Sequence, residues 1–356
     1  MSAVKTIRVN TDKAYNVTIG KELLPRVGAL VAENIRPCKA AIITDSNVAP
    51  LYLQKLHESL RMSGFDVCYH VFPAGEKNKN IAVLSGILEF LAENQLTRND
   101  CVFALGGGVT GDMAGFAAGC YLRGIKYIQI PTTLLAAVDS SVGGKTAIDL
   151  KAGKNLAGLF VQPSAVICDT DCLITLSDDL FADGLAEAIK TGILFDRELF
   201  DLCDNARDSG NIEEIIFRCV QWKAKIVSED EKETGVRKLL NLGHTPGHAI
   251  EKLSNYTVSH GNAVAIGTVI MARAAERLGL TSTPCAAEIS LMLLSNGLHV
   301  SPRYSAEQLA EAALNDKKRS GDSITLVLPT EIGKCITETF PVSALTDVFR
   351  AGMMNN

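Results

Sequence analysis

The chain has 356 residues, more than the roughly 250 to 300 at which a single core stops growing, so two domains are expected. Its composition, with 47% hydrophobic and 21% charged residues, excludes a disordered, fibrous or disulfide-dense protein. The net charge of -5 argues against a nucleic-acid surface, and apolar stretches such as 263–272 are shorter than the ~18 residues that span a bilayer.

The first half of the chain alternates short β-rich runs with helical segments. The amino terminus enters a strand-like pattern without the apolar core of a signal peptide, so we expect a cytoplasmic protein. Helical periodicity, as in 81–95, separates further predicted strands at 39–45, 67–72, 101–105, 126–131 and 164–169. This βαβ pattern predicts a parallel sheet covered by helices on both faces.

Beyond Asp171 the pattern becomes mostly helical. Apolar residues recur at helical spacing in 185–195, 213–227, 261–279 and 286–297, and one late run, 323–329, resembles a strand. The sequence therefore predicts an α/β domain over residues 1–175 and a mostly α-helical domain over residues 176–356. We expect ligands to bind in the cleft between the two domains.

A glycine-rich loop directly follows the strand at 101–105. Gly106, Gly108 and Gly111 fit the G-x-G-x-x-G spacing, in which the backbone approaches a pyrophosphate at a helix amino terminus. A structural tight turn is the alternative interpretation. Residues 122–138 contain no acid that could bind a ribose, so Asp45, with Asn47 beside it, is the candidate for that role; capping of its own loop is the alternative.

Three of the six histidines, His244, His248 and His260, fall within seventeen residues. Thr245 and Pro246 resemble an N-cap and a first helical residue, which predicts His244 at the mouth of a helix, and His260 is likewise expected to precede a helix. Helix capping is the alternative role for these rings. With Glu187 they could form a His, His, Glu set that leaves one position open, as in catalytic zinc sites.

Isolated basic residues lie in glycine-rich or boundary segments instead of long charged runs. Each one alone could be a surface charge. Together they suggest a small polyanionic substrate, since lysine and arginine make charge-assisted hydrogen bonds to anions. This set consists of Arg123, Lys145, Lys154, Lys190, Lys223, Arg237 and Lys318.

Four blocks of sequence resemble the 3-dehydroquinate synthase family. They are GGGVTGDMAGFAAGCYLRGIKYIQIPTTLLAAVDSSVGGKTAIDLKAGKNLAGLF, GLAEAIKTGI, LLNLGHTPGHAIE and SHGNAVAIG. The resemblance implies a Rossmann-like α/β domain followed by a mostly helical domain. It also implies a homodimeric, NAD- and zinc- or cobalt-dependent carbon–oxygen lyase of the shikimate pathway to aromatic amino acids. Such an enzyme converts 3-deoxy-D-arabino-heptulosonate 7-phosphate, a small phosphorylated sugar acid, to 3-dehydroquinate and phosphate, by transient oxidation, phosphate elimination, re-reduction and aldol closure.

The resemblance also implies roles for individual residues. The metal ligands match Glu187, His244 and His260. The NAD contacts match Asp45, Asn47, Glu76, Lys79, Gly107, Gly108, Asp112, Thr132, Thr133, Asp139, Lys145, Lys154 and Thr175. The substrate contacts match Arg123, Lys145, Asn155, Lys190, Lys223, Arg237, Asn241, His248 and Lys318, with Lys317 as a competitor for the last position.

Two positions depart from the family pattern. Pro246 stands where a bulky apolar residue is common, and Asn262 replaces the usual Glu after His260 and Gly261. The second change removes a carboxylate near the expected metal, which would weaken the orientation of His260 if that carboxylate held it.

Other activities share parts of this pattern. Another sugar-phosphate cyclase, such as 2-deoxy-scyllo-inosose or amino-dehydroquinate synthase, is one alternative. A metal-dependent alcohol or glycerol dehydrogenase is a second, and it would release NADH instead of recycling it. An NAD-binding regulator without activity is a third, and it would release no phosphate.

Overall fold

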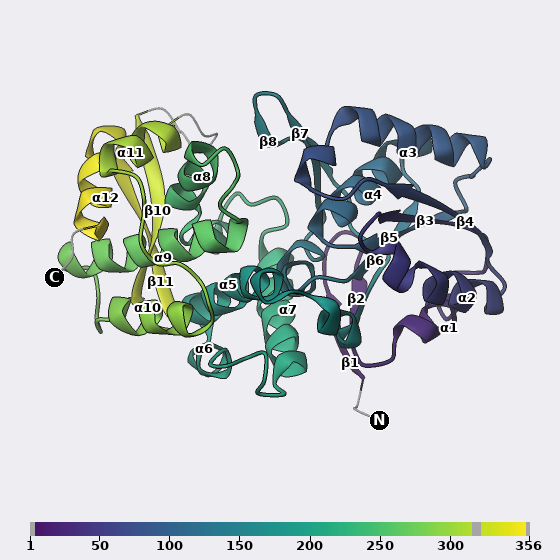
Figure 1. Cartoon of the computed structure of the whole chain (residues 1–356), viewed down its shortest axis with the longest axis horizontal. Coiled ribbons are helices and arrows are strands. Elements are labelled where there is room, and N and C mark those ends of the chain that lie inside the picture. The colour runs from purple at the N-terminus through teal and green to yellow at the C-terminus, as the bar shows by residue number, and fades with distance from the viewer. Residues whose placement is uncertain (1–3, 315–321, 354–356) are drawn as a thin grey trace. The chain divides into compact units, whose positions relative to one another are not determined.

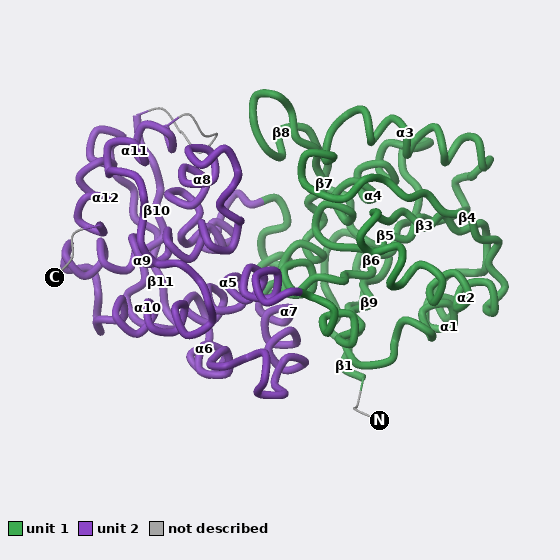
Figure 2. The backbone as a smooth tube through the Cα atoms, viewed as in Figure 1, with its two compact units in different colours: residues 1–176, 223–232 green, residues 177–222, 233–356 purple. Residues whose placement is uncertain are grey.

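The computed structural model describes residues 4–314 and 322–353. The chain divides into two compact units, shown in separate colours in Figure 2. Unit 1 comprises Met1–Leu176 and Lys223–Lys232, and unit 2 comprises Ser177–Trp222 and Glu233–Asn356. Within the described ranges, no helix is both long and apolar enough to cross a membrane.

Among the described residues, unit 1 contains a seven-stranded sheet, a separate hairpin, four complete α-helices and the end of a fifth (Figure 1). The sheet strands are β1 (Lys5–Val9), β2 (Tyr15–Gly20), β3 (Lys39–Asp45), β4 (Asp66–Phe72), β5 (Cys101–Gly106), β6 (Lys126–Pro131) and β9 (Ala165–Asp169). The hairpin consists of β7 (Lys145–Leu150) and β8 (Gly153–Phe160). The helices are α1 (Val27–Ala32), α2 (Gln54–Met62), α3 (Ile81–Glu93) and α4 (Gly108–Cys120).

The strand order in the sheet is β1-β2-β9-β6-β5-β3-β4. Only β1 and β2 pair antiparallel; β2, β9, β6, β5, β3 and β4 run parallel. From β3 the chain reaches β4 on one side and then β5 on the other, so the strand order reverses beside β3. In open α/β sheets, ligands bind beyond the carboxyl ends of the strands at such a reversal.

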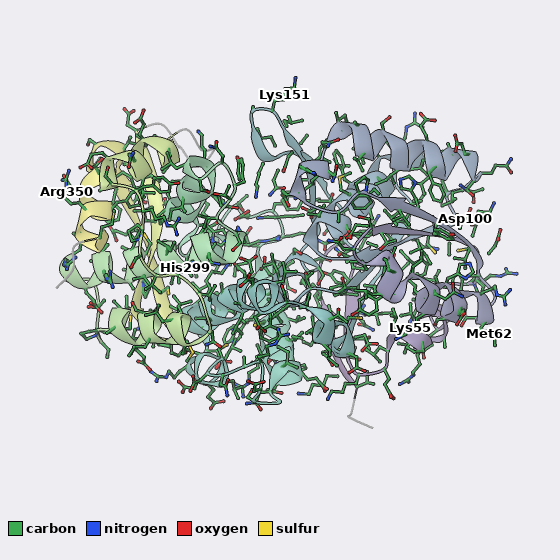
Figure 3. All side chains as sticks on the ribbon, in the orientation of Figure 1. Lys55, Met62, Asp100, Lys151, His299 and Arg350 are labelled. Carbon is green, nitrogen blue, oxygen red and sulfur yellow. The ribbon has the colours of Figure 1, made fainter. Side chains whose placement is uncertain are left out.

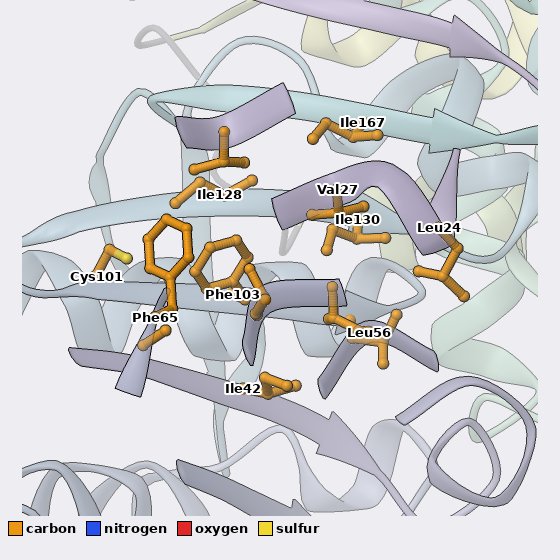
Figure 4. Close-up of a cluster of buried hydrophobic side chains, with 14 of the residues drawn as sticks. Leu24, Val27, Ile42, Leu56, Phe65, Cys101, Phe103, Ile128, Ile130 and Ile167 are labelled. Atoms are coloured by element: carbon orange, nitrogen blue, oxygen red, sulfur yellow. The ribbon is translucent and has the colours of Figure 1, made fainter. Parts of the chain in front are cut away.

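Helices cover both faces of the central part of this sheet. Successive side chains of a strand point to opposite faces, so neighbouring residues pack against different helices. On β3, Ile42 packs with α1 and α2, whereas the neighbouring Ile43 packs with α3 and α4. Phe103 and Ala104 divide in the same way on β5. Figure 4 shows the first of these clusters, in which side chains from α1 and α2 cover Ile42 and Phe103. The predicted Rossmann-like parallel sheet is confirmed.

Unit 2 is mostly helical, as predicted. Its helices are α5 (Asp178–Phe195), α6 (Arg197–Leu202), α8 (His244–Leu253), α9 (His260–Arg277), α10 (Ala286–Ser295), α11 (Ala306–Leu314) and α12 (Leu345–Met353). Helix α7 (Ile212–Glu229) is divided, with its part from Lys223 onward counted in unit 1. The strand predicted at 323–329 is β10 (Ser323–Glu331), which pairs antiparallel with β11 (Lys334–Pro341).

Four strands were not recognised in the sequence: β2, β7, β8 and β11. Side chains on β8 and β11 are mostly intermediate or exposed, so neither strand shows the apolar alternation of a half-buried strand. Each is paired with a neighbour close in sequence, and that pairing is a property of the folded hairpin. Expecting a single late strand in the second half was therefore wrong.

Candidate functional site

Glu187, His244 and His260 come together in unit 2. Glu187 lies on α5, while His244 and His260 are the first residues of α8 and α9. One ligand atom from each of the three lies within 4.8 Å of the others. Glu187 Oε1 is 3.8 Å from His244 Nε2 and 3.5 Å from His260 Nε2. Two imidazole nitrogens and a carboxylate oxygen are donors that suit a divalent zinc or cobalt ion.

Helix α8 begins at His244, two residues earlier than the first helical residue that the sequence indicated, Pro246. Gly243 adopts a left-handed φ of 74° before His244, and a side chain there would meet Thr268 Oγ1 at 2.4 Å. This glycine therefore fixes the turn into the helix, so the prediction of Thr245 as N-cap was wrong. Pro246 lies in the first turn, where its missing N–H costs nothing.

Helix α9 begins at His260, so the expectation that this histidine precedes the helix was also wrong. Ser259 occupies the N-cap position but makes no capping hydrogen bond with its side chain. Instead, the backbone N–H of Gly261 donates to Asp183 Oδ1 at 2.6 Å, and Asp183 lies on α5. An acid from the helix that carries Glu187 thus stabilises the start of the helix that carries His260.

The second nitrogen of each ring also faces an acceptor. His244 Nδ1 is 3.0 Å from the carbonyl oxygen of Leu242, and His260 Nδ1 is 3.5 Å from Glu251 Oε2. Burial alone would lower the pKa of His260, but hydrogen bonds to Glu187 and Glu251 raise it to about 10. A metal ion would have to displace a proton from this ring, as metal-binding histidines require.

Glu251 was missed in the sequence. Its only signal is the spacing of His244, His248 and Glu251 at i, i+4 and i+7, which places them on one face of α8. The ring centroid of His248 lies 5.4 Å from that of His244 and 6.3 Å from that of His260.

Other predicted substrate residues of unit 2 lie in buried or paired positions. Lys190, one turn after Glu187 on α5, forms an ion pair with its Oε2, and both side chains are buried. Arg237 is only 2% exposed and Asn241 Nδ2 donates to Glu233 Oε1 at 2.9 Å. Lys317 and Lys318 lie outside the described residues.

Asn262, which departs from the family pattern, does not face the histidine rings. Its Nδ2 donates to Ser259 Oγ at 2.9 Å, and its Oδ1 accepts from the backbone N–H of His299 at 2.9 Å. This side chain connects the start of α9 to the segment after α10. The carboxylates beside His260 are those of Glu187 and Glu251.

In unit 1, the glycine loop connects β5 to α4 at the reversal of strand order. Gly108 is the first residue of α4 and follows Gly107. Asp45, at the end of β3, accepts hydrogen bonds from the backbone N–H groups of Asn47 and Val48 and from Thr110 Oγ1 in the first turn of α4. It therefore caps its own loop, the alternative considered from the sequence, and also joins the end of β3 to the start of α4.

The glycines of this loop differ in what a side chain would meet. A Cβ atom would lie 2.4 Å from Thr110 Oγ1 at Gly106, 2.9 Å from Thr133 at Gly107 and 2.6 Å from Gln129 Oε1 at Gly111. At Gly108 the nearest atom is Ser140 Oγ, at 3.2 Å. Close packing against neighbouring side chains therefore explains why three of these positions are glycine. At Gly108 a side chain would meet the least obstruction from the protein itself.

Lys79 brings together several of the predicted cofactor and substrate residues. Its buried ammonium lies 2.5 Å from Asp112 Oδ2 and 2.5 Å from Asn155 Oδ1. Glu76 Oε1 lies 3.9 Å from Lys79 Nζ and 4.0 Å from Lys154 Nζ. Burial raises the pKa of Asp112 to about 6, although Lys79 opposes this shift.

The other cofactor and substrate residues predicted in unit 1 have partners other than Lys79 or are exposed. Lys223 Nζ donates to the carbonyl oxygen and to Oδ1 of Asp139, both at 2.6 Å. Thr132, next to Thr133, donates its backbone N–H to Gly106 O at 3.0 Å, which places both threonines beside the glycine loop. Thr175 Oγ1 is 2.6 Å from the hydroxyl of Tyr52, while Arg123 and Lys145 are exposed.

Comparison with known proteins identifies the family. A family model described as "3-dehydroquinate synthase N-terminal" matches residues 69–183, and one described as "3-dehydroquinate synthase C-terminal" matches residues 184–319. The chain belongs to the 3-dehydroquinate synthase family. The first match contains the glycine loop and Lys79, and the second contains Glu187, His244 and His260.

Individual relatives are similar along nearly the whole chain. A 3-dehydroquinate synthase of Clostridium kluyveri is 42% identical over 93% of this chain and 94% of its own length. One of Caldanaerobacter subterraneus subsp. tengcongensis is 45% identical over 91% of this chain and 93% of its own. Among solved structures, 2-deoxy-scyllo-inosose synthase with carbaglucose-6-phosphate, NAD+ and Co2+ has a TM-score of 0.88, with 27% identity over 98% of this chain and 99% of that one.

Proposed function

We propose that this protein converts 3-deoxy-D-arabino-heptulosonate 7-phosphate to 3-dehydroquinate and phosphate. The observation that carries the proposal is the Glu187, His244 and His260 cluster in a chain of the 3-dehydroquinate synthase family. Its identity to 3-dehydroquinate synthases, 42% and 45%, exceeds the 27% to 2-deoxy-scyllo-inosose synthase, and this favours dehydroquinate as the product. A homodimer and a classification as a carbon–oxygen lyase belong to the same proposal.

The residues present fit NAD and one divalent ion. Glu187, His244 and His260 would hold zinc or cobalt, and the loop at Gly107 and Gly108 would receive the pyrophosphate of NAD. When bound, NAD supplies reversible hydride transfer at a substrate hydroxyl, and the metal ion supplies Lewis-acid polarisation of substrate oxygens.

The basic side chains would orient the substrate by its charged ends. A sugar acid phosphate carries a carboxylate and a phosphate, and each anion needs charge-assisted donors once water leaves. Lys145, Lys223 and Arg237 offer such donors, and His248 stands beside the metal ligands to hydrogen-bond a substrate oxygen. Holding both ends limits the motion of the chain that must later close into a ring.

Steady-state turnover distinguishes this function from that of a dehydrogenase. With NAD far below the substrate concentration, we expect many equivalents of phosphate and dehydroquinate per NAD and no net accumulation of NADH, because the same site takes and returns the hydride. Phosphate, product and absorbance of NADH would be measured together. Build-up of NADH with simple alcohols, without phosphate from the heptulosonate, would contradict the proposal.

A substitution in the glycine loop tests the NAD site. Gly108→Val should weaken NAD binding, because a side chain at the helix start would hold the backbone away from the pyrophosphate. Gly86→Val is the matched control, since Gly86 is an exposed helical residue of the same unit with open space around it. NAD affinity by fluorescence titration and thermal unfolding would be measured for both. Equal affinity in folded Gly108→Val and control would mean that the loop is only a turn.

A further inference from the structure

We propose that Glu251 is the positioning residue of the metal centre: its carboxylate accepts a hydrogen bond from Nδ1 of His260 and so directs Nε2 toward the metal. This inference rests on the metal site proposed above. It assigns to Glu251 a role that neither the histidine cluster nor the glycine motif indicated.

The geometry around His260 supports this role. Nδ1 faces Glu251 Oε2 at 3.5 Å, and Nε2 faces Glu187 Oε1 at 3.5 Å, so the imidazole lies between two carboxylates. Glu251 is only 4% exposed. A buried carboxylate needs a partner, and His260 supplies one.

The same arrangement occurs at the other histidine. His244 Nδ1 faces the carbonyl oxygen of Leu242 at 3.0 Å, and His244 Nε2 faces Glu187. Metal-binding histidines usually donate their second N–H to a carboxylate or a carbonyl group, which fixes the tautomer and the orientation of the ring. Leu242 and Glu251 thus play equivalent parts, with a backbone acceptor in one case and a side chain in the other.

Glu251 reaches His260 from a well-anchored helix end. Its backbone carbonyl accepts from the N–H of Tyr256 at 2.7 Å and from Ser254 Oγ at 2.9 Å. Helices α8 and α9 also pack closely, because a Cβ at Gly267 would lie 2.1 Å from the carbonyl oxygen of Gly243. Both ends of the hydrogen bond are therefore held by rigid elements, as precise ligand placement requires.

Two substitutions of Glu251 test the inference in the full-length protein. Glu251→Ala should lower zinc affinity by about 10- to 100-fold, the usual effect of losing such a partner. Glu251→Gln should show a smaller loss, because its amide oxygen still accepts a hydrogen bond but carries no charge. Glu288→Gln is the control: it removes the same charge from an exposed acid of unit 2 and should bind zinc like the wild type.

The measurements need no turnover. Zinc affinity would be obtained by competition with a chromogenic chelator, ligand geometry from the visible absorption bands of bound Co2+, and folding from thermal unfolding of the metal-free proteins. We expect the Co2+ bands of Glu251→Ala to change at an unchanged thermal midpoint, which a purely structural role would not produce.

The outcomes separate this inference from the proposed function. If the wild type bound neither zinc nor Co2+, the metal centre itself would be wrong. If the wild type bound both and folded Glu251→Ala matched it in affinity and spectrum, only the role of Glu251 would be overturned. If Glu251→Ala failed to fold, Glu251→Gln would decide, because affinity equal to that of Glu288→Gln would overturn the role.

Discussion

His244→Ala should abolish metal retention and catalytic activity together. Three protein side chains form the cluster, and a catalytic zinc site with three protein ligands has none to spare. The loss of zinc affinity should exceed the roughly 100-fold upper range for residues that only orient a ligand. Zinc content after dialysis, measured by atomic emission, and phosphate release by the same preparation would report both effects.

The matched control for this variant is His299→Ala. His299 is exposed, is labelled in Figure 3, and connects to α9 through its backbone N–H, which the substitution keeps. It should retain full zinc occupancy and activity. Full occupancy in His244→Ala would mean that the three ligands had been assigned wrongly.

The central strands of the sheet could be predicted from the sequence because they are buried on both faces. The runs at 39–45 and 126–131 became β3 and β6 without any change in bounds, since continuous apolar residues between turns are typical of parallel strands. The hairpin of β7 and β8 could not be found in this way, because no residue of β8 is buried and the apolar residues of β7 do not alternate strictly with polar ones. Its strands are defined by pairing with each other.

The candidate site, too, could be predicted only in part. The scarcity of histidines was enough to bring His244 and His260 into one cluster with Glu187. The partner of His260 was not predictable, because Glu251 is one of many acids in the sequence and becomes distinctive only when α8 packs on α9. Likewise, the meeting of Asp112 with Asn155 at Lys79 depends on the hairpin that the sequence did not reveal.

Lys145→Ala should reduce turnover far more than it reduces NAD binding. Lys145 is exposed on β7, so its loss creates no cavity, and the folded state should keep its stability. A hydrogen bond between a charged donor and an anion is worth about 1.5 to 3 kcal/mol, which corresponds to roughly a 10- to 150-fold loss in kcat/KM. Arg237→Ala should act in the same direction, but burial of Arg237 makes a loss of stability part of its effect.

Lys151→Ala provides the comparison. Lys151 lies at the turn between β7 and β8, is exposed, and carries the same charge on the same hairpin (Figure 3). If Lys145 binds an anionic end of the substrate, Lys151→Ala should have the kcat/KM of the wild type at an ionic strength where the kcat/KM of Lys145→Ala is reduced. Equal losses in both variants, which added salt would shrink, would instead indicate general electrostatic attraction of the substrate by the hairpin. Equal activity of both variants and the wild type would remove Lys145 from the substrate site, and the anion would then have to be bound by other basic residues of the predicted set, such as Lys223 or Arg237.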